Sequence, residues 1–296
     1  MTSLAHRIVL TENCNASCKH CFNANVRNKN EMDADVLIDF MRRNSEYLEY
    51  TSLKIMGGEP TLHPRIMDII QEGLKHYFTV SLFTNGINID RIVKRFGNRI
   101  SYTVNGYTFD PKKDFEVLHF VITKNDTEKV IDKMMKCIAS HPKSIFVYSP
   151  DTQVNIFDEE EFNDYRKTWI EATKIIVPEL NKRKMRWQLD HNLPLCFFTE
   201  EINNELEKLS LPTKIFSSCK CVEIGLIDWN FDLYYCNQTR IKLGTILNKS
   251  IPELNEMVQN SREKKIDNIK LNKKCQHCEL INKCGMGCYY NGGRHV

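Results

Sequence analysis

The sequence lacks any apolar run long enough to cross a membrane. A spanning helix needs about 20 apolar residues, and no stretch of about 18 or more occurs here. The start of the chain, Met1 to Arg7, holds too short an apolar segment for a signal peptide. We therefore expect a cytoplasmic protein with no membrane partner.

The sequence also lacks a strong excess of either charge. It has 41 basic and 38 acidic residues, a net charge of +3, and the basic residues are scattered. The lysine-rich stretches 182–186 and 264–274 are interpreted as solvated faces rather than nucleic-acid sites. We therefore predict no nucleic-acid partner.

Cysteine, in contrast, is abundant, with 12 residues in a chain of 296. Disulfides are rare in the cytoplasm, so clustered cysteines in that compartment indicate metal. Cys137 and Cys196 stand apart from the others. The remaining ten form an N-terminal group of three and a C-terminal group of seven.

The N-terminal group has the spacing C-x3-C-x2-C directly after a short apolar run, residues 8–10. Three thiolates can ligate three irons of a 4Fe–4S cube and leave the fourth iron open. Clusters that only carry electrons usually have four cysteine ligands. The group therefore suggests chemistry at an open iron. Its members are Cys14, Cys18 and Cys21.

A second motif, Gly57-Gly58-Glu59-Pro60, begins 36 residues after the third cysteine. With the cysteines it resembles the radical S-adenosylmethionine (radical SAM) superfamily, although His20 stands where an aromatic residue is common. The resemblance implies that the open iron chelates the amino and carboxylate groups of S-adenosylmethionine. It also implies that the Gly57 to Glu59 segment hydrogen-bonds the methionine amino group. Glycines permit close approach of backbone to a ligand, and a carboxylate accepts from an ammonium.

Short β-rich runs alternate with helical patterns along the first two thirds of the chain, which predicts parallel strands joined by crossover helices. The fold class is α/β, a partial (β/α)6 TIM-like barrel followed by a small cysteine-rich α+β iron–sulfur domain. Pro64 is expected in the first turn of the second helix. We expect strands near 7–11, 51–56, 78–84, 100–105, 117–123 and 144–148, and helices near 33–47, 64–76, 88–96, 127–140 and 159–184.

Ligands of such sheets bind at the carboxyl ends of the strands. The two motifs follow the first and second predicted strands. Polar residues also lie at the ends of the third and fourth predicted strands. All four segments should therefore meet at the mouth of the barrel, at the carboxyl ends of its strands. The family resemblance implies that these polar groups contact the ribose or carboxylate of S-adenosylmethionine; the alternative is that Asn85-Gly86 is only a turn. The predicted contacts are Thr84, Asn85, Thr103 and Asn105.

The C-terminal cysteines include a run with the spacing C-x2-C-x5-C-x3-C between residues 275 and 288. Zinc is one interpretation, because C-x2-C pairs build zinc ribbons, but seven cysteines exceed one tetrahedral site. The run resembles the SPASM extension of radical SAM enzymes, which implies one or two auxiliary 4Fe–4S clusters and a domain division at 1–190 and 191–296. The implied ligands are Cys219, Cys221, Cys236 and Cys288 for the first cluster and Cys275, Cys278 and Cys284 for the second.

Two departures from the SPASM pattern matter. Phe231 stands five residues before Cys236, where the family has glycine. No cysteine follows Cys288, so the second cluster has a non-cysteine ligand or an open iron, or it does not form. Cys196 is interpreted as a buried cysteine, a cluster ligand or a catalytic hydrogen donor as in radical SAM epimerases. Cys137 is expected in the core, and His191 is interpreted as a structural residue.

The resemblance implies an enzyme that cleaves S-adenosylmethionine reductively to a 5′-deoxyadenosyl radical, which abstracts a substrate hydrogen. The outcome is oxidation, crosslinking or epimerisation of a ribosomally made peptide; the alternative is a dehydrogenase or epimerase of a small molecule such as a sugar or aminocyclitol. Expected partners are an electron donor such as flavodoxin or ferredoxin and the substrate. The first strand begins near residue 7, so we expect no leader-binding module at that end, and a separate leader-binding protein is one option. A purely electron-carrying protein is disfavoured, because it has no use for Gly57 to Glu59.

Overall fold

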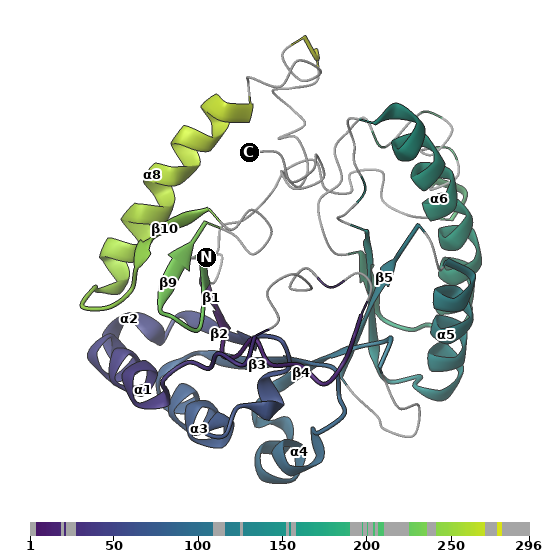
Figure 1. Cartoon of the computed structure of the whole chain (residues 1–296). Coiled ribbons are helices and arrows are strands. Elements are labelled where there is room, and N and C mark those ends of the chain that lie inside the picture. The colour runs from purple at the N-terminus through teal and green to yellow at the C-terminus, as the bar shows by residue number, and fades with distance from the viewer. Residues whose placement is uncertain are drawn as a thin grey trace. The chain divides into compact units, whose positions relative to one another are not determined.

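The computed structural model describes residues 4–18, 21, 28–108, 116–124, 127–151, 154, 158–189, 197, 200, 204, 207–209, 225–235, 241–269 and 277–279. The chain divides into two compact units (Figure 1). Unit 1 comprises residues 1–110 and 221–265, and unit 2 comprises residues 111–220 and 266–296. Within the described residues, no helix combines the length and apolar content required to span a membrane.

Unit 1 contains a mostly parallel sheet in the order β10-β9-β8-β1-β2-β3-β4. The pairs from β8 through β1 to β4 are parallel, whereas β8–β9 and β9–β10 are antiparallel. The strands are β1 (Leu4–Val9), β2 (Thr51–Met56), β3 (Thr79–Thr84), β4 (Ser101–Asn105), β8 (Leu226–Ile227), β9 (Asp232–Tyr234) and β10 (Lys242–Thr245).

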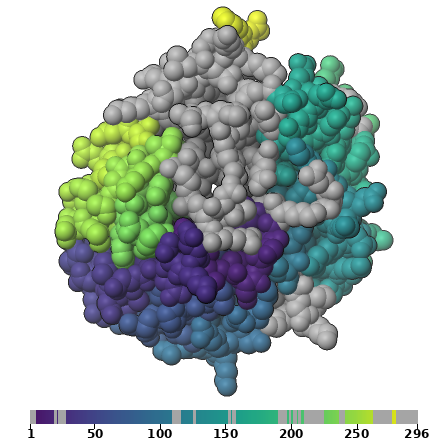
Figure 2. Space-filling model, viewed as in Figure 1, coloured from purple at the N-terminus to yellow at the C-terminus, as the bar shows by residue number. Residues whose placement is uncertain are grey.

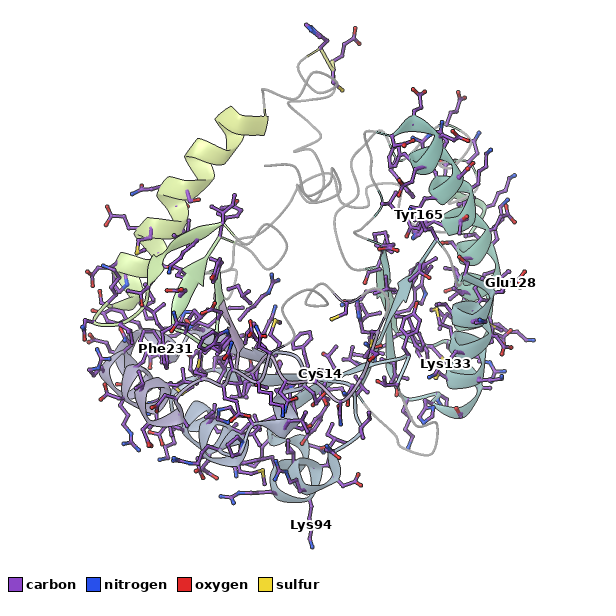
Figure 3. The ribbon with its side chains drawn as sticks, viewed as in Figure 1. Cys14, Lys94, Glu128, Lys133, Tyr165 and Phe231 are labelled. Carbon is purple, nitrogen blue, oxygen red and sulfur yellow. The ribbon has the colours of Figure 1, made fainter. Side chains whose placement is uncertain are left out.

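In unit 1, helices follow β1, β2, β3 and β10. They are α1 (Ala34–Arg43), α2 (Ser45–Leu48), the 3-10 helix η2 (Pro60–Leu62), α3 (Ile66–His76), α4 (Asp90–Phe96), the 3-10 helix η3 (Gly97–Arg99) and most of α8 (Ile251–Ile269). The α4 helix is amphipathic: Ile92 and Phe96 are buried, and Lys94 points away from the sheet into solvent (Figure 3). One apolar stripe per helix is what packing on a sheet requires.

Buried and half-buried side chains alternate along the strands of the unit 1 sheet. Leu53 and Ile55 on β2, Leu82 on β3 and Val104 on β4 are fully buried, with half-buried residues between them. Burying a leucine or isoleucine side chain stabilises the fold by about 1.5–3 kcal/mol. The added Cβ of any larger residue at Gly73 on α3 would meet the Leu53 side chain at 2.8 Å, so this helix lies directly on β2.

The start of α1 is capped by a side chain, and the start of α3 differs from its prediction. Asp33 caps α1, and its side chain accepts from the backbone N–H groups of Asp35 and Val36, which satisfies otherwise unpaired donors. Pro64 was expected inside the second helix, but α3 begins at Ile66 with Arg65 as its N-cap, so that prediction is wrong. The proline in a first helical turn is instead Pro60, at the start of η2.

Unit 2 contains β5 (Val117–Ile122), β6 (Ile145–Pro150) and β7 (Trp187–Leu189), paired in that order and all parallel. The helices α5 (Thr127–Ser140) and α6 (Glu159–Lys182) pack on each other. Aromatic rings form the core: Trp169 on α6 contacts Tyr148 on β6 and lies edge-on to Phe197, with ring centroids 5.4 Å apart. Offset and edge-on aromatic pairs add about 0.5–1.5 kcal/mol each to area burial.

All six predicted strands and all five predicted helices are confirmed, with small shifts at their ends; α2 is the separated last turn of the first predicted helix. The strands β7 to β10 and the helix α8 were not predicted. Residues 225–235 and 241–261 return to the N-terminal part of unit 1: Ile227 pairs with Ile8, and the Ile251 N–H donates to Asn44 Oδ1. The space-filling view shows this green segment adjoining the purple N-terminal residues (Figure 2).

Candidate active site

The cysteine group lies in the loop after β1, on unit 1 (Figure 3). Cys14, Cys18 and Cys21 are half-buried and not in disulfides, and the Cys21 N–H donates to the Cys18 carbonyl at 3.2 Å. Because β1 to β4 are parallel, their carboxyl ends share one edge of the sheet. The loop therefore shares that edge with the Gly57 to Glu59 segment.

The backbone of this loop is bonded directly to the glycine motif. The Gly58 N–H donates to the Thr11 carbonyl at 2.7 Å, and the Glu59 N–H donates to the Asn13 carbonyl at 2.8 Å. A Cβ added at Gly57 would lie 2.6 Å from the Thr11 oxygen, and one at Gly58 would lie 2.4 Å from the Asn13 oxygen. The glycine pair is thus required by the chain's own cysteine loop. Sequence reasoning attributed the same glycines to the approach of a ligand.

The Glu59 carboxylate connects three segments of this edge. It is fully buried, and its Oε1 accepts from the Thr84 hydroxyl at 2.7 Å and from the Thr61 N–H at 3.0 Å. Its Oε2 accepts from the Asn85 N–H at 2.7 Å. A carboxylate oxygen has about two lone-pair sites, and among the described residues Oε2 accepts from one donor.

The donors around Glu59 are all neutral. Among the residues that the structure describes, no lysine, arginine or histidine forms an ion pair with this carboxylate. A buried charge without a counter-ion is costly unless it is well hydrogen-bonded, as it is here. Such a site favours a cationic ligand, because an ammonium would offset the remaining charge.

Asn85 ties the end of β3 to the cysteine loop. Its Nδ2 donates to Asn15 Oδ1 at 2.7 Å, and its Oδ1 accepts from the Ile87 N–H at 3.0 Å. Gly86 has φ of 78°, the left-handed conformation that favours glycine. The segment is therefore a turn whose amide side chain also holds the loop between Cys14 and Cys18.

Asn105, the last residue of β4, reaches the cysteine loop directly. Its Nδ2 donates to Cys18 Sγ at 3.7 Å, and its Oδ1 accepts from the Tyr107 N–H at 2.9 Å. Thr103 is half-buried on the same strand and makes no side-chain hydrogen bond with any described residue. The structure thus gathers the predicted polar residues at one edge; their predicted contacts with S-adenosylmethionine stay predictions.

Three cysteines on one loop are the kind of ligands that an iron–sulfur cube takes, because each thiolate of a cube binds a different iron. Cys14, Cys18 and Cys21 are half-buried and outside disulfides, and an amide donates to the sulfur of Cys18. Within the described part of the chain, no three histidine, cysteine or acidic side chains form a group that could hold one metal ion.

Comparison with known proteins identifies the family. Residues 8–153 match the model of the radical SAM superfamily. A probable GTP 3′,8-cyclase of Thermococcus kodakarensis is 31% identical over 213 residues, which cover 70% of this chain and 67% of that protein. The chain belongs to the radical SAM superfamily, and the expected resemblance is confirmed.

Another relative aligns over a shorter stretch. A tungsten-containing aldehyde ferredoxin oxidoreductase cofactor-modifying protein of Pyrococcus furiosus is 33% identical over 79 residues. That match covers 26% of this chain and 22% of the relative, so the chain aligns with about a fifth of that protein's length. So short a match does not transfer the activity of that relative to this chain.

Two solved structures share the fold along nearly the whole chain. Native anSMEcpe with bound AdoMet and Cp18Cys peptide superposes with a TM-score of 0.66 at 18% identity, covering 99% of this chain and 92% of that one. Streptococcus suis SuiB bound to precursor peptide SuiA gives a TM-score of 0.65 at 18% identity, covering 98% of this chain and 72% of that one. The predicted TIM-like radical SAM fold is confirmed.

Most of the C-terminal predictions fall outside the described residues. Cys196, Cys219, Cys221, Cys236, Cys275, Cys284, Cys288 and His191 lie there, and only Cys278 of that group is described, as a half-buried residue. Cys137 is buried in α5, as expected, and burial raises the pKa of its thiol to about 11. Such a thiol is a poor nucleophile at neutral pH.

Phe231 gives a physical reason for the glycine of the SPASM pattern. It lies in the turn between β8 and β9 with φ of 62°, a conformation in which glycine has no steric penalty (Figure 3). The ring is nonetheless buried, and the backbone carbonyl accepts from the Ile246 N–H at 2.9 Å. In this chain the turn between β8 and β9 thus holds an aromatic residue in a conformation that favours glycine.

One polar pair was missed from the sequence. On β5, Leu118, Phe120 and Ile122 are buried, while the alternate residue His119 is half-buried and its Nε2 lies 2.5 Å from Ser149 Oγ on β6. Alternation within the predicted fifth strand was the available signal, since it sets His119 apart from the apolar face. A histidine with a hydroxyl partner can hold or move a proton.

Proposed function

We propose that this protein is a radical SAM enzyme that modifies a ribosomally made peptide by oxidation, crosslinking or epimerisation. Cys14, Cys18 and Cys21 would hold the catalytic 4Fe–4S cluster. When bound, that cluster and S-adenosylmethionine supply a 5′-deoxyadenosyl radical able to abstract a substrate hydrogen. The chain's own residues position the cofactor and keep water out.

The observation that carries this proposal is the bonded network at the edge of unit 1. The cysteine loop is held by the backbone of Gly58 and Glu59, by Asn85 through Asn15, and by Asn105 at Cys18. A cluster loop fixed from three strands is preorganised, so binding of the cofactor costs little reordering.

Glu59 would act in two ways in this account. It holds Thr84 and Asn85 against the glycine motif, and its Oε2 retains one site for the methionine ammonium. The neutral surroundings of Glu59 favour that cation. Gly57, Thr103 and Asn105 would contribute backbone or polar contacts to the same ligand.

A peptide substrate is supported by the structures that match along the whole chain. The anSMEcpe and SuiB structures each contain a bound peptide, and the first is covered over 92% of its length. The alternative substrate is a small molecule. It is favoured by the similarity to probable GTP 3′,8-cyclases, which suggests a nucleotide beside the sugar or aminocyclitol of the sequence-based alternative.

Residues 191–296 would form the SPASM-like domain with one or two auxiliary 4Fe–4S clusters on the C-terminal cysteines. A flavodoxin or ferredoxin would supply electrons, and a separate protein would present the leader of the peptide. Cys196 would be a ligand or a hydrogen donor. The next residue, Phe197, is fully buried against Trp169 on α6.

The test of the substrate class is genetic and chemical together. Short peptides and biosynthetic small molecules encoded or made beside this gene would be incubated with the reconstituted, reduced enzyme and S-adenosylmethionine. The proposal predicts a peptide product that has lost hydrogen, or one whose mass is unchanged when the reaction is run in H2O and rises by one deuterium when it is run in D2O. Turnover of a nucleotide or sugar with no change in any peptide would reject the peptide and establish the alternative.

A further inference from the structure

We propose that Asn105 sets the reduction potential of the cluster by donating an N–H hydrogen bond to the sulfur of Cys18. The inference rests on the proposed function, because it assumes that Cys18 ligates the cluster. Asn105 is a positioning residue in this account, since it acts on the cluster through Cys18.

The orientation of the Asn105 amide is fixed by its neighbours. The Tyr107 N–H donates to Oδ1 at 2.9 Å, which makes that atom the oxygen and leaves the Nδ2 group facing Cys18 Sγ at 3.7 Å. The backbone is held as well, because the N–H and the hydroxyl of Thr108 both donate to the Asn105 carbonyl at 3.2 Å. The amide is therefore a preset donor at the end of β4.

The consequence for the cluster follows from charge. Reduction adds one negative charge to the cluster and its thiolates, so a donor at a ligand sulfur stabilises the reduced form more than the oxidised form. Hydrogen bonds to cluster sulfurs are among the factors that set the potential of iron–sulfur proteins. Asn105 thus makes the electron needed for S-adenosylmethionine cleavage easier to accept.

The test is a redox titration of the full-length, reconstituted protein, monitored by the EPR signal that changes when S-adenosylmethionine is added. That signal must be missing from the Cys14/Cys18/Cys21→Ala variant, which separates it from auxiliary clusters. Asn105→Leu keeps the side-chain size and removes the donor. We expect its reduction equilibrium to weaken about tenfold, a shift of about 59 mV to a lower potential for one electron.

Controls separate this role from a structural one. Ser101→Ala removes a polar group at the start of the same strand without touching Cys18, and its potential should equal that of the wild type. Asn105→Gln keeps an amide donor and should recover part of the shift. If Asn105→Leu does not load its cluster, Asn105→Ser provides the same measurement with a smaller disturbance.

A loaded cluster in Asn105→Leu or Asn105→Ser with the wild-type potential overturns this inference and leaves the proposed function standing. A wild-type protein that forms no cluster responsive to S-adenosylmethionine overturns both.

Discussion

Glu59 and Glu72 are two buried carboxylates of unit 1 with opposite surroundings. Glu72, on α3, accepts from Arg42 at 2.7 Å and Lys75 at 2.7 Å, and lies 3.2 Å from His76. These partners, Arg42 foremost, lower the pKa of Glu72 to about 2. Glu59, at the carboxyl end of β2, has hydroxyl and backbone N–H partners among the described residues and no basic one.

The difference separates a carboxylate held by cations of the chain from one that we propose binds a ligand. Arg42 and Lys75 offset the charge of Glu72, so it has no need of a ligand. The charge of Glu59 is hydrogen-bonded but not offset, which suits a site for an ammonium. Glu72 lies on a helix that covers the sheet, whereas Glu59 lies at the strand ends, where we propose that the cofactor binds.

The largest predicted effect is at the cysteine loop. Cys14→Ala should abolish reductive cleavage of S-adenosylmethionine, because the cube then loses one of its three thiolates. The readouts are 5′-deoxyadenosine and iron content. Cys137→Ala is the matched control: this cysteine is buried in α5 and should be neutral for cleavage. Cleavage retained by Cys14→Ala would place the cluster elsewhere.

Gly58→Ala tests whether the strand-end site depends on close backbone contact. The new Cβ would lie 2.4 Å from the Asn13 oxygen, and backbone on both sides leaves little room to adjust. We expect most of the catalytic cluster to be lost while α3 and the sheet still fold. Gly97→Ala controls for general destabilisation: its φ of 49° disfavours a side chain, but nothing lies within 4 Å of the added Cβ, so it should keep its cluster. A fully loaded Gly58→Ala protein would contradict the account.

Glu59→Gln and Glu72→Gln break the comparison directly. Glu59→Gln should weaken S-adenosylmethionine binding by about tenfold to a hundredfold, the range expected for one charge-assisted hydrogen bond of about 1.5–3 kcal/mol, with iron content unchanged. Glu72→Gln should leave binding unchanged. Isothermal titration of both variants with S-adenosylmethionine measures this. Equal affinity of the wild type and Glu59→Gln would rule out the contact between Glu59 and the ammonium.

Glu72 predicts a pH dependence of stability rather than of binding. Its folded pKa of about 2 lies below its ordinary value, so its stabilisation is complete above about pH 4.5 and is lost as the pH falls toward 2. In a cluster-free background, Glu72→Gln should cost about 1–2 kcal/mol at pH 7 and less as the pH falls. Urea unfolding of the wild type and Glu72→Gln at pH 7, 4 and 3 measures this. A difference in unfolding free energy that stays the same at all three pH values would refute it.

The smallest predicted effect is the difference in stability between two substitutions of Phe231. Phe231→Ala should destabilise by about 3 kcal/mol through lost burial, which exceeds the strain relieved by any change at this φ. Phe231→Gly loses the same ring but removes the left-handed penalty, so it should be about 1 kcal/mol more stable than Phe231→Ala. Thermal unfolding of the pair tests this ordering; the reverse ordering would show that the backbone is not strained.

The sequence predicted what depends on local pattern. Alternation identified the strand Thr51–Met56, and spacing identified Cys14, Cys18 and Cys21. The strand Leu226–Ile227 has two residues, too few for any periodicity, and it is specified by the close approach of Gly225 to the Tyr234 carbonyl. The helix α8 did have a signal: the Ser250 N–H donates to Glu253 Oε2, half of a capping box in the sequence Ser-Ile-Pro-Glu.

Long-range partners could not be predicted in the same way. Asn105 and Cys18 are 87 residues apart, and Asn85 and Asn15 are 70 apart, so no local rule pairs them. The carboxyl-end rule brought these residues to one edge, and packing then chose which atoms meet. The role of the Gly57–Gly58 pair was inferred for a ligand, whereas its nearest neighbours are Thr11 and Asn13.

The most direct test of the central claim is 5′-deoxyadenosine formation by the anaerobically reconstituted, reduced protein, beside the Cys14/Cys18/Cys21→Ala variant. The account predicts 5′-deoxyadenosine from the wild type and none from the variant, with S-adenosylmethionine bound only by the wild type. A cluster-loaded wild type that neither binds nor cleaves S-adenosylmethionine would contradict it.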